Sequence, residues 1–159
     1  MEITTQTLAE QPFLKGLSES QLTTLLADAL PSEFAEGEQV FTEGDPANRF
    51  YLLISGSVAV ELPSEDNPER TPVLIETLGP GDVLGWSWLF APYRWHFDAR
   101  ALTPVKAVFF YGTRLRSQCE NDHELGYELM RRTAEVVVNR LHATRRRMFQ
   151  TMKRETIVI

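Results

Sequence analysis

The side chains that could do chemistry are concentrated in residues 81–95, which read GDVLGWSWLFAPYRW. This stretch holds all three tryptophans of the chain, and Arg94 stands between the last two. An arginine can pair with a phosphate and an indole N–H can donate a hydrogen bond, but indole rings also fill apolar space. The stretch is therefore compatible with a buried phosphate site, with an apolar ligand pocket, or with a pocket closed by its own tryptophans.

No catalytic or metal-binding pattern accompanies this stretch. His96, His123 and His142 lie far apart in the sequence, whereas a metal site in a β-roll enzyme needs clustered histidines and a carboxylate. Cys119 has no neighbouring feature of a nucleophile, and the sequence contains no Walker loop, CxxC pair or Ser-His-Asp pattern. We predict a protein without enzymatic activity, bound metal or cofactor.

The composition predicts one globular domain. With 159 residues, of which 43% are hydrophobic and 24% charged, the chain can bury a core. We place the domain at residues 13–150 and expect residues 1–12 and 151–159 to be flexible tails. No apolar run approaches the ~20 residues of a membrane span, and the N-terminus lacks the pattern of a signal peptide. Together with the single cysteine, this predicts a cytoplasmic protein without a membrane span.

The charges divide the chain into two parts. Residues 1–130 carry 8 basic and 20 acidic side chains, a net charge of −12, whereas residues 131–159 carry 8 basic and 2 acidic ones, a net charge of +6. This pattern has two interpretations. The basic residues form a solvated helix face, or they form a contact site for nucleic acid, a membrane surface or an acidic partner.

The spacing of apolar residues predicts the elements. Ser18 and Gln21 fit a capping box before a helix over residues 19–29, which Pro31 ends. Between residues 33 and 111, short β-rich runs alternate with turn signals such as EGD, SG and GPGD. Closely spaced strands and turns are typical of antiparallel sheets. The predicted fold class is mainly β with flanking helices: an antiparallel β-roll or jelly roll, a short N-terminal helix and a long C-terminal dimerisation helix.

Helical periodicity returns after Gly112. A short helix is expected over residues 113–120, followed by a long helix that reaches about residue 150. Along the long helix apolar residues alternate by three and four positions, which is the pattern of a coiled-coil seam. We therefore predict a parallel homodimer. Its interface residues would be Tyr127, Met130, Ala134, Val137, Leu141 and Met148.

Three segments carry a resemblance to a known family. They are FTEGDPANRFYLLISGSVAVEL (residues 41–62), LGPGDVLG (78–85) and NRLHATRRR (139–147). Together they resemble cyclic nucleotide-binding domains of the catabolite activator (Crp/Fnr-like) type. The resemblance covers about residues 13–150, and it implies a β-roll sensor domain with a dimer helix and a phosphate-binding cassette after the second segment.

The cassette departs from the family pattern. In nucleotide-binding members a glutamate after the glycine accepts from the ribose hydroxyl, and an arginine pairs with the cyclic phosphate. Here Gly85 is kept, but Trp86 stands at the glutamate position and, counting back from ARA at 99–101, Trp95 stands at the arginine position, with Arg94 one residue away. Thr144 matches a helix threonine that contacts the base in some members. The candidate ligand-binding residues are Gly85, Trp86, Ser87, Arg94, Trp95, His96 and Thr144.

These departures favour a ligand other than cyclic AMP or cyclic GMP, because a desolvated phosphate needs charged partners. The main hypothesis is a non-catalytic regulatory sensor that binds another small ligand or docks on a partner protein. The alternative is a ligand-free dimeric scaffold whose pocket is plugged by tryptophans, and a lesser alternative is a cyclic-nucleotide binder that uses Arg94. A cavity beside Trp86 and Trp95 would favour the sensor, and close packing there would favour the scaffold.

The sequence also bears on DNA binding. The chain continues for only nine residues after Gln150, which is too short for a helix-turn-helix module. We expect no sequence-specific DNA binding, and only weak contact through the arginines of the basic part.

Overall fold

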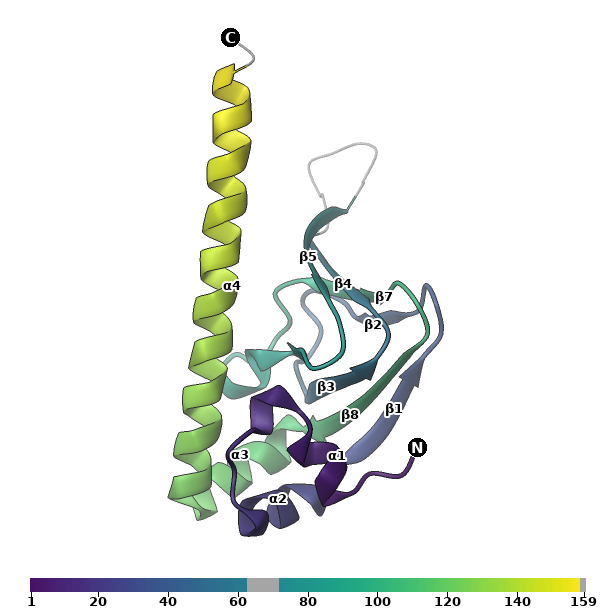
Figure 1. Cartoon of the computed structure of the whole chain (residues 1–159), viewed down its shortest axis with the longest axis vertical. Coiled ribbons are helices and arrows are strands. Elements are labelled where there is room, and N and C mark those ends of the chain that lie inside the picture. The colour runs from purple at the N-terminus through teal and green to yellow at the C-terminus, as the bar shows by residue number, and fades with distance from the viewer. Residues whose placement is uncertain (63–71, 158–159) are drawn as a thin grey trace.

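Two antiparallel four-stranded sheets form a β-roll, with helices at one end and along one side (Figure 1). The computed structural model describes residues 1–62 and 72–157, with side chains up to Lys153. The strand orders are β1-β8-β3-β6 and β2-β7-β4-β5. The strands are β1 (Leu30–Phe34), β2 (Gln39–Phe41), β3 (Arg49–Ser55), β4 (Val58–Leu62), β5 (Val73–Leu78), β6 (Val83–Leu84), β7 (Asp98–Ala101) and β8 (Val105–Tyr111).

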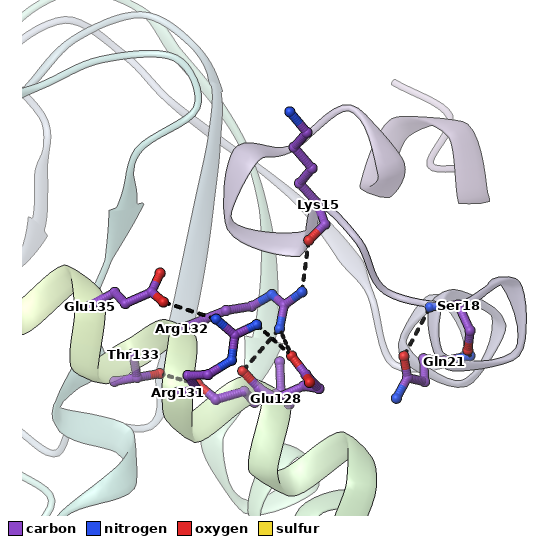
Figure 2. A network of polar contacts seen from close by, with 9 residues as sticks. Lys15, Ser18, Gln21, Glu128, Arg131, Arg132, Thr133 and Glu135 are labelled. Carbon is purple, nitrogen blue, oxygen red and sulfur yellow. Dashed lines mark hydrogen bonds and ion pairs between the residues drawn. The ribbon is translucent and has the colours of Figure 1, made fainter.

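Helices precede, interrupt and follow the roll, and they confirm the predicted fold class. They are α1 (Thr5–Ala9), η1 (Pro12–Leu14), α2 (Glu19–Leu26), η2 (Trp86–Leu89), α3 (Gly112–Asn121) and α4 (His123–Ile157). The capping box before α2 is present. The Ser18 side chain accepts from the Gln21 backbone N–H at 3.1 Å, and the Gln21 side chain accepts from the Ser18 N–H at 2.9 Å (Figure 2). The helix is three residues shorter than predicted, since it ends at Leu26 with Ala27 as its C-cap.

The two ends of the chain differ from the expected flexible tails. Residues Thr5–Ala9 form α1, which is capped by Thr4 and buries Leu8 completely. A leucine that packs into the core fixes the segment around it, so residues 1–12 include a structural element. At the other end, α4 continues without interruption past residue 151 to Ile157.

Sheet β1-β8-β3-β6 separates two hydrophobic cores. Because side chains alternate along a strand, Phe50 and Leu52 of β3 face the helices, while Tyr51 and Leu53 face the interior of the roll. The interior core also takes residues from β4, β6 and β7 of both sheets. A strand with two buried faces explains why residues 50–53 are a continuous apolar run rather than an alternating one.

The first half of α4 is anchored, and the second half extends beyond the roll (Figure 1). Arg132 is buried, donates to the Lys15 carbonyl at 2.7 Å, and pairs with Glu128, so it ties the N-terminal segment to α4 (Figure 2). Arg131 bridges Glu128 and Glu135 on the outer face, at 2.9 Å each. No helix in the described part of the chain is long and apolar enough to cross a membrane.

Candidate functional site

The tryptophans lie on the segment that joins β6 to β7, which we call the cassette loop (residues 85–97). It begins at Gly85, whose φ of +96° is the left-handed conformation that glycine tolerates. A Cβ at this position would lie 2.6 Å from the Trp95 ring and 3.0 Å from the Arg49 carbonyl. The two ends of the loop therefore touch, and only glycine fits between the Trp95 ring and the β3 backbone.

Trp95 fills the interior of the roll. Its side chain is 4% exposed and stacks on Phe41, with ring centroids 3.8 Å apart and an interplanar angle of 7°. The backbone of Trp95 is held on both sides, since its N–H donates to the Asp45 carbonyl and its carbonyl accepts from Gly44. This indole is a core residue, and it occupies the position that the resemblance assigns to the phosphate-binding arginine.

Trp88 belongs to the other core. It is 1% exposed and packs against Phe50. It also lies close to Gly112, since a Cβ built on Gly112 would lie 2.9 Å from the Trp88 Cβ. Its indole Nε1 finds no acceptor among the described residues, and its carbonyl accepts from Arg116. The ring packs on β3 while the backbone and Cβ of Trp88 contact α3, so this residue has a structural role.

Trp86 has different surroundings, because its ring borders open space. It lies among the rings of Phe90, His96 and Phe97, with centroids 6.1–6.4 Å away. It also lines a cavity of about 190 Å³ between the roll and α4. The cavity is lined by Val60, Ile75, Glu76, Trp86, Phe97, Val137, Arg140, Leu141 and Thr144. Most of these side chains are apolar, so the cavity suits an apolar ligand.

Three polar side chains border this cavity. The Arg140 guanidinium donates to the Val83 carbonyl and lies 3.6 Å from the Glu76 carboxylate. Burial lowers the pKa of Arg140, and the carboxylates of Glu76 and Asp82 oppose that shift. The Thr144 hydroxyl donates to the Arg140 carbonyl one helical turn earlier, which leaves its oxygen able to accept from a ligand. These groups can orient a bound molecule, but they form no pair of nucleophile and base.

The residues predicted from the sequence are only partly brought together. Trp86 and Thr144 line the cavity, and Gly85 contacts Trp95. Arg94 does not line the cavity, since its side chain is exposed and donates to the Gly44 carbonyl at 2.8 Å. Ser87 is buried within η2, and His96 is exposed against Trp86.

The sequence did not predict three lining side chains from the strands, Val60, Ile75 and Glu76, and it did not predict Phe97 of the cassette loop or Arg140. The sequence held a signal for Arg140, because it precedes Thr144 by four residues and therefore shares its helix face. Val60 and Glu76 are cross-strand partners in the β4–β5 pair, a relation that depends on register and is not visible in the sequence.

The predicted dimer seam is largely uncovered. Tyr127, Met130, Leu141 and Met148 are 65%, 51%, 54% and 60% exposed. Ala134 is exposed as well, whereas Val137 is half-buried and lines the cavity. The cavity and the seam therefore share one side of α4.

Known proteins are similar to this chain in sequence. The family model described as "Cyclic nucleotide-binding domain" matches residues 31–122. The "CRP-like cAMP-activated global transcriptional regulator" of Mycobacterium tuberculosis is 31% identical over 137 residues, which are 86% of this chain and 58% of that protein. "Glutaminase 1" of Bradyrhizobium diazoefficiens is 33% identical over 139 residues, 86% of this chain and 21% of that protein. This chain therefore covers less than two thirds of the length of each of these relatives.

A solved structure shows the same fold over nearly the whole chain. It is a "Putative Cyclic nucleotide-binding protein from Geobacter metallireducens GS-15", 31% identical, with a TM-score of 0.77. The similarity covers 89% of this chain and 100% of that one.

Proposed function

This chain belongs to the cyclic nucleotide-binding domain family, and from that premise we propose a non-catalytic regulatory domain that binds a small, largely apolar ligand instead of a cyclic nucleotide. The observation that carries the proposal is the cavity of about 190 Å³ beside Trp86, next to a roll interior that Trp95 fills. The described residues that border the cavity offer positioning groups and no reactive pair.

The closed interior argues against a cyclic phosphate. A phosphate that leaves water needs charge-assisted hydrogen bonds, each worth about 1.5–3 kcal/mol. At the expected phosphate position the roll offers the Trp95 ring stacked on Phe41, which carries no charge. Arg94, the basis of the lesser alternative, would have to leave the Gly44 carbonyl and turn inward past a closely packed ring.

The size of the cavity narrows the ligand class. Pockets for drug-sized ligands have about 300–1,000 Å³, whereas dry apolar cavities of about 150 Å³ bind benzene. A cavity of about 190 Å³ is therefore suited to a single ring or a fused pair of small rings. The Arg140–Glu76 pair and the Thr144 oxygen lie at its edge and would meet one polar substituent.

A second candidate function is a ligand-free dimeric scaffold. It rests on the close packing of Trp95 and Trp88, which are both core residues. Under this alternative the space beside Trp86 is a packing defect, and docking on a partner protein is the whole function. Filling the cavity artificially would then leave every activity of the protein intact.

Assembly and location belong to the same proposal. The exposed seam on α4 supports a parallel homodimer, since contiguous apolar surface favours pairing. The compartment proposed for this dimer is the cytoplasm, where cell fractionation would place it.

Calorimetric titration tests the proposal. Indole is the probe, because it is flat, mostly apolar and small, and cyclic AMP is titrated in parallel. We expect indole to bind and cyclic AMP to show no dissociation constant below about 50 μM. Ile75→Trp, inside the cavity, should abolish indole binding, whereas Val73→Trp, two residues away on β5 and outside the cavity, should not. Equal indole binding by both variants, or none by the wild type, would refute the cavity as a ligand site.

A further inference from the structure

A second hollow lies between the N-terminal segment, the turn from β5 to β6, and α4. Residues 131–146 of α4 form one wall of this cleft, and residues 12–15, β5 and residues 81–83 form the other. Its volume of about 520 Å³ lies within the roughly 300–1,000 Å³ of small-molecule sites. The function proposed above does not use this cleft.

The cleft and the cavity beside Trp86 lie against different faces of α4. The cleft is lined by a stripe whose members are three or four residues apart and therefore share one helix face: residues 132, 136, 139, 143 and 146. The cavity is lined by residues 137, 141 and 144, and Arg140 lies between the two stripes and lines both hollows. Because the predicted seam includes residues 137 and 141, the cleft lies on a face of α4 that pairing of two copies does not use.

Two arginines of the cleft already have partners within the protein. Arg131 bridges Glu128 and Glu135 at 2.9 Å each, and Arg132 pairs with Glu128 and donates to the Lys15 carbonyl at 2.7 Å (Figure 2). These contacts hold α4 against the N-terminal segment. The two arginines therefore build the wall of the cleft, and recognition of a ligand falls to other side chains.

Three side chains on α4 offer hydrogen-bond donors to the cleft. In the described part of the chain, the Arg146 guanidinium and the Asn139 carboxamide have no hydrogen-bond or ion-pair partner. The Arg140 guanidinium donates to the Val83 carbonyl, but its Nε lies 3.6 Å from the Glu76 carboxylate, which is longer than a hydrogen bond. Burial lowers the pKa of Arg140, so its charge is only partly compensated. These donors are suited to a carboxylate, which guanidinium groups bind through charge-assisted hydrogen bonds.

Two carboxylates line the cleft near these donors. The Glu76 carboxylate is half-buried and accepts no hydrogen bond from any residue that the structure describes. Asp82 uses one oxygen to accept from the Gly79 N–H at 2.8 Å, and its other oxygen is left for a ligand. Both carboxylates act on the charge of Arg140, so they lie close to it. They would repel a simple anion, whereas they would attract an ammonium group on the same ligand. The arrangement therefore favours a zwitterion.

The net charge of the cleft narrows the ligand further. The lining carries three carboxylates, Glu76, Asp82 and Glu135, and five cations, Lys15, Arg131, Arg132, Arg140 and Arg146. Glu128, which pairs with two of these arginines from outside the lining, reduces the excess from two positive charges to one. The Lys15 ammonium has no ion-pair partner among the described residues. A zwitterion adds no net charge, so one further carboxylate on the ligand balances the cleft.

We infer that the cleft binds a free α-amino acid with an acidic side chain. Its ammonium group lies between Glu76 and Asp82, and its α-carboxylate is bound by Asn139, Arg140 and Arg146. The side-chain carboxylate points towards Lys15. This site goes beyond the proposed function, because it needs neither an occupied cavity beside Trp86 nor a second copy of the chain.

Calorimetric titration with L-glutamate tests the inference, with two analogues that each lack one charged group. Glutarate lacks the ammonium group, and 4-aminobutyrate lacks the α-carboxylate. We expect L-glutamate to bind and both analogues to bind at least about tenfold more weakly, because each leaves one set of charged side chains without a partner. Equal binding of either analogue, or no binding of L-glutamate up to about 10 mM, would overturn the inference.

Two pairs of variants test the position of the site. Arg146→Gln removes a cation that lines the cleft, and Arg147→Gln removes its exposed neighbour outside the cleft. Asp82→Asn removes a charge but keeps an oxygen for the Gly79 N–H, and Asp45→Asn is the same change at an exposed position outside the cleft. Each cleft variant should raise the L-glutamate dissociation constant about tenfold or more, and each control should change it less than about twofold. Equal losses in a cleft variant and its control would overturn the site.

Indole separates a failure of this inference from a failure of the proposed function. None of the four substituted residues lines the cavity beside Trp86, so indole binding should be unchanged in every variant. A wild-type protein that binds L-glutamate but not indole refutes the cavity as a ligand site and supports this inference. A wild-type protein that binds indole but not L-glutamate supports the proposed function and overturns the amino-acid site.

Discussion

Trp95 and Trp86 lie at opposite ends of the cassette loop, and their rings have very different surroundings. Trp95 is stacked on Phe41 inside the roll, in contact with Gly85 and almost without solvent exposure. Trp86 is half-buried and has a ring surface that borders the cavity under α4. One end of the loop is closed by a core residue, and the other end leaves room for a ligand.

Under the proposed function, this difference decides which ligands the pocket can accept. A cyclic nucleotide needs a charged end for its phosphate and an apolar end for its base. Under that proposal the stacked Trp95 ring offers a phosphate no charge, while Thr144 and the apolar side chains under α4 border a space for a ligand. The closed end adds stability, and the open end can supply recognition.

The largest expected effect is the difference between the two tryptophans in their contribution to the free energy of unfolding. Trp95→Ala should lower the free energy of unfolding by about 3–5 kcal/mol, because it removes a buried ring and leaves a cavity in the roll core. Trp86→Ala, half-buried beside space that already exists, should cost about 1 kcal/mol. Denaturation by urea, monitored by far-ultraviolet circular dichroism, measures both. Equal losses would mean that Trp86 is as much a core residue as Trp95.

The contact between Gly85 and Trp95 gives the next largest effect. Gly85→Ala combines a positive φ with a Cβ placed 2.6 Å from the Trp95 ring, and it should cost about 1–3 kcal/mol. In the double variant with Trp95→Ala the ring is gone. The loss of unfolding free energy in the double variant should therefore be smaller than the sum of the losses in the two single variants. Full additivity in urea denaturation would show that Gly85 is required by its backbone conformation alone.

A smaller effect is expected for the arginine beside the loop. Arg94→Ala removes an exposed hydrogen bond to the Gly44 carbonyl and should change stability by less than about 0.5 kcal/mol, with indole binding unchanged. Arg100→Ala is the control. It leaves the buried carboxylate of Glu61 without its 2.7 Å partner and should cost about 1–3 kcal/mol. A loss of ligand affinity in Arg94→Ala would instead support the reading in which Arg94 serves the pocket.

How much of this could be predicted from the sequence depends on how local each feature is. The capping box at Ser18 and Gln21 could be predicted from the sequence, because all of its contacts fall within four residues. The helix α1 was missed although a similar local signal exists, since Thr4 and Thr7 form a capping box of their own. The β-roll and α4 could be predicted from periodicity together with the family resemblance.

The division of the tryptophans between core and cavity could not be predicted. Neighbours in the sequence, Trp86 and Trp88, face a cavity and a core because η2 turns the chain between them. The cavity depends on the register of β4 and β5 and on the line that α4 takes across the roll. Both are tertiary features, and the sequence contains no local signal for them.

The smallest expected effect concerns the basic C-terminal part of α4 at residues 145–147, whose arginines line neither the cavity beside Trp86 nor the core around Trp95. Arg145, Arg146 and Arg147 are exposed, and DNA should bind them weakly and without sequence preference, through release of counterions alone. Their joint replacement by alanine should remove this binding and leave indole affinity unchanged. Fluorescence anisotropy with two unrelated duplexes, at low and at physiological salt, measures it. Selective binding at physiological salt would contradict this expectation.

The most direct test of the account uses the three indole N–H groups as separate reporters. In a nitrogen-15 labelled sample the Nε1–H signals of Trp86, Trp88 and Trp95 are assigned with single Trp→Phe variants, and the protein is then titrated with indole and with cyclic AMP. We expect indole to shift the Trp86 signal while the Trp88 and Trp95 signals stay in place, and we expect cyclic AMP to shift none of them. Movement of the Trp95 signal with micromolar cyclic AMP would contradict the second expectation, because the interior of the roll would then be open to the phosphate.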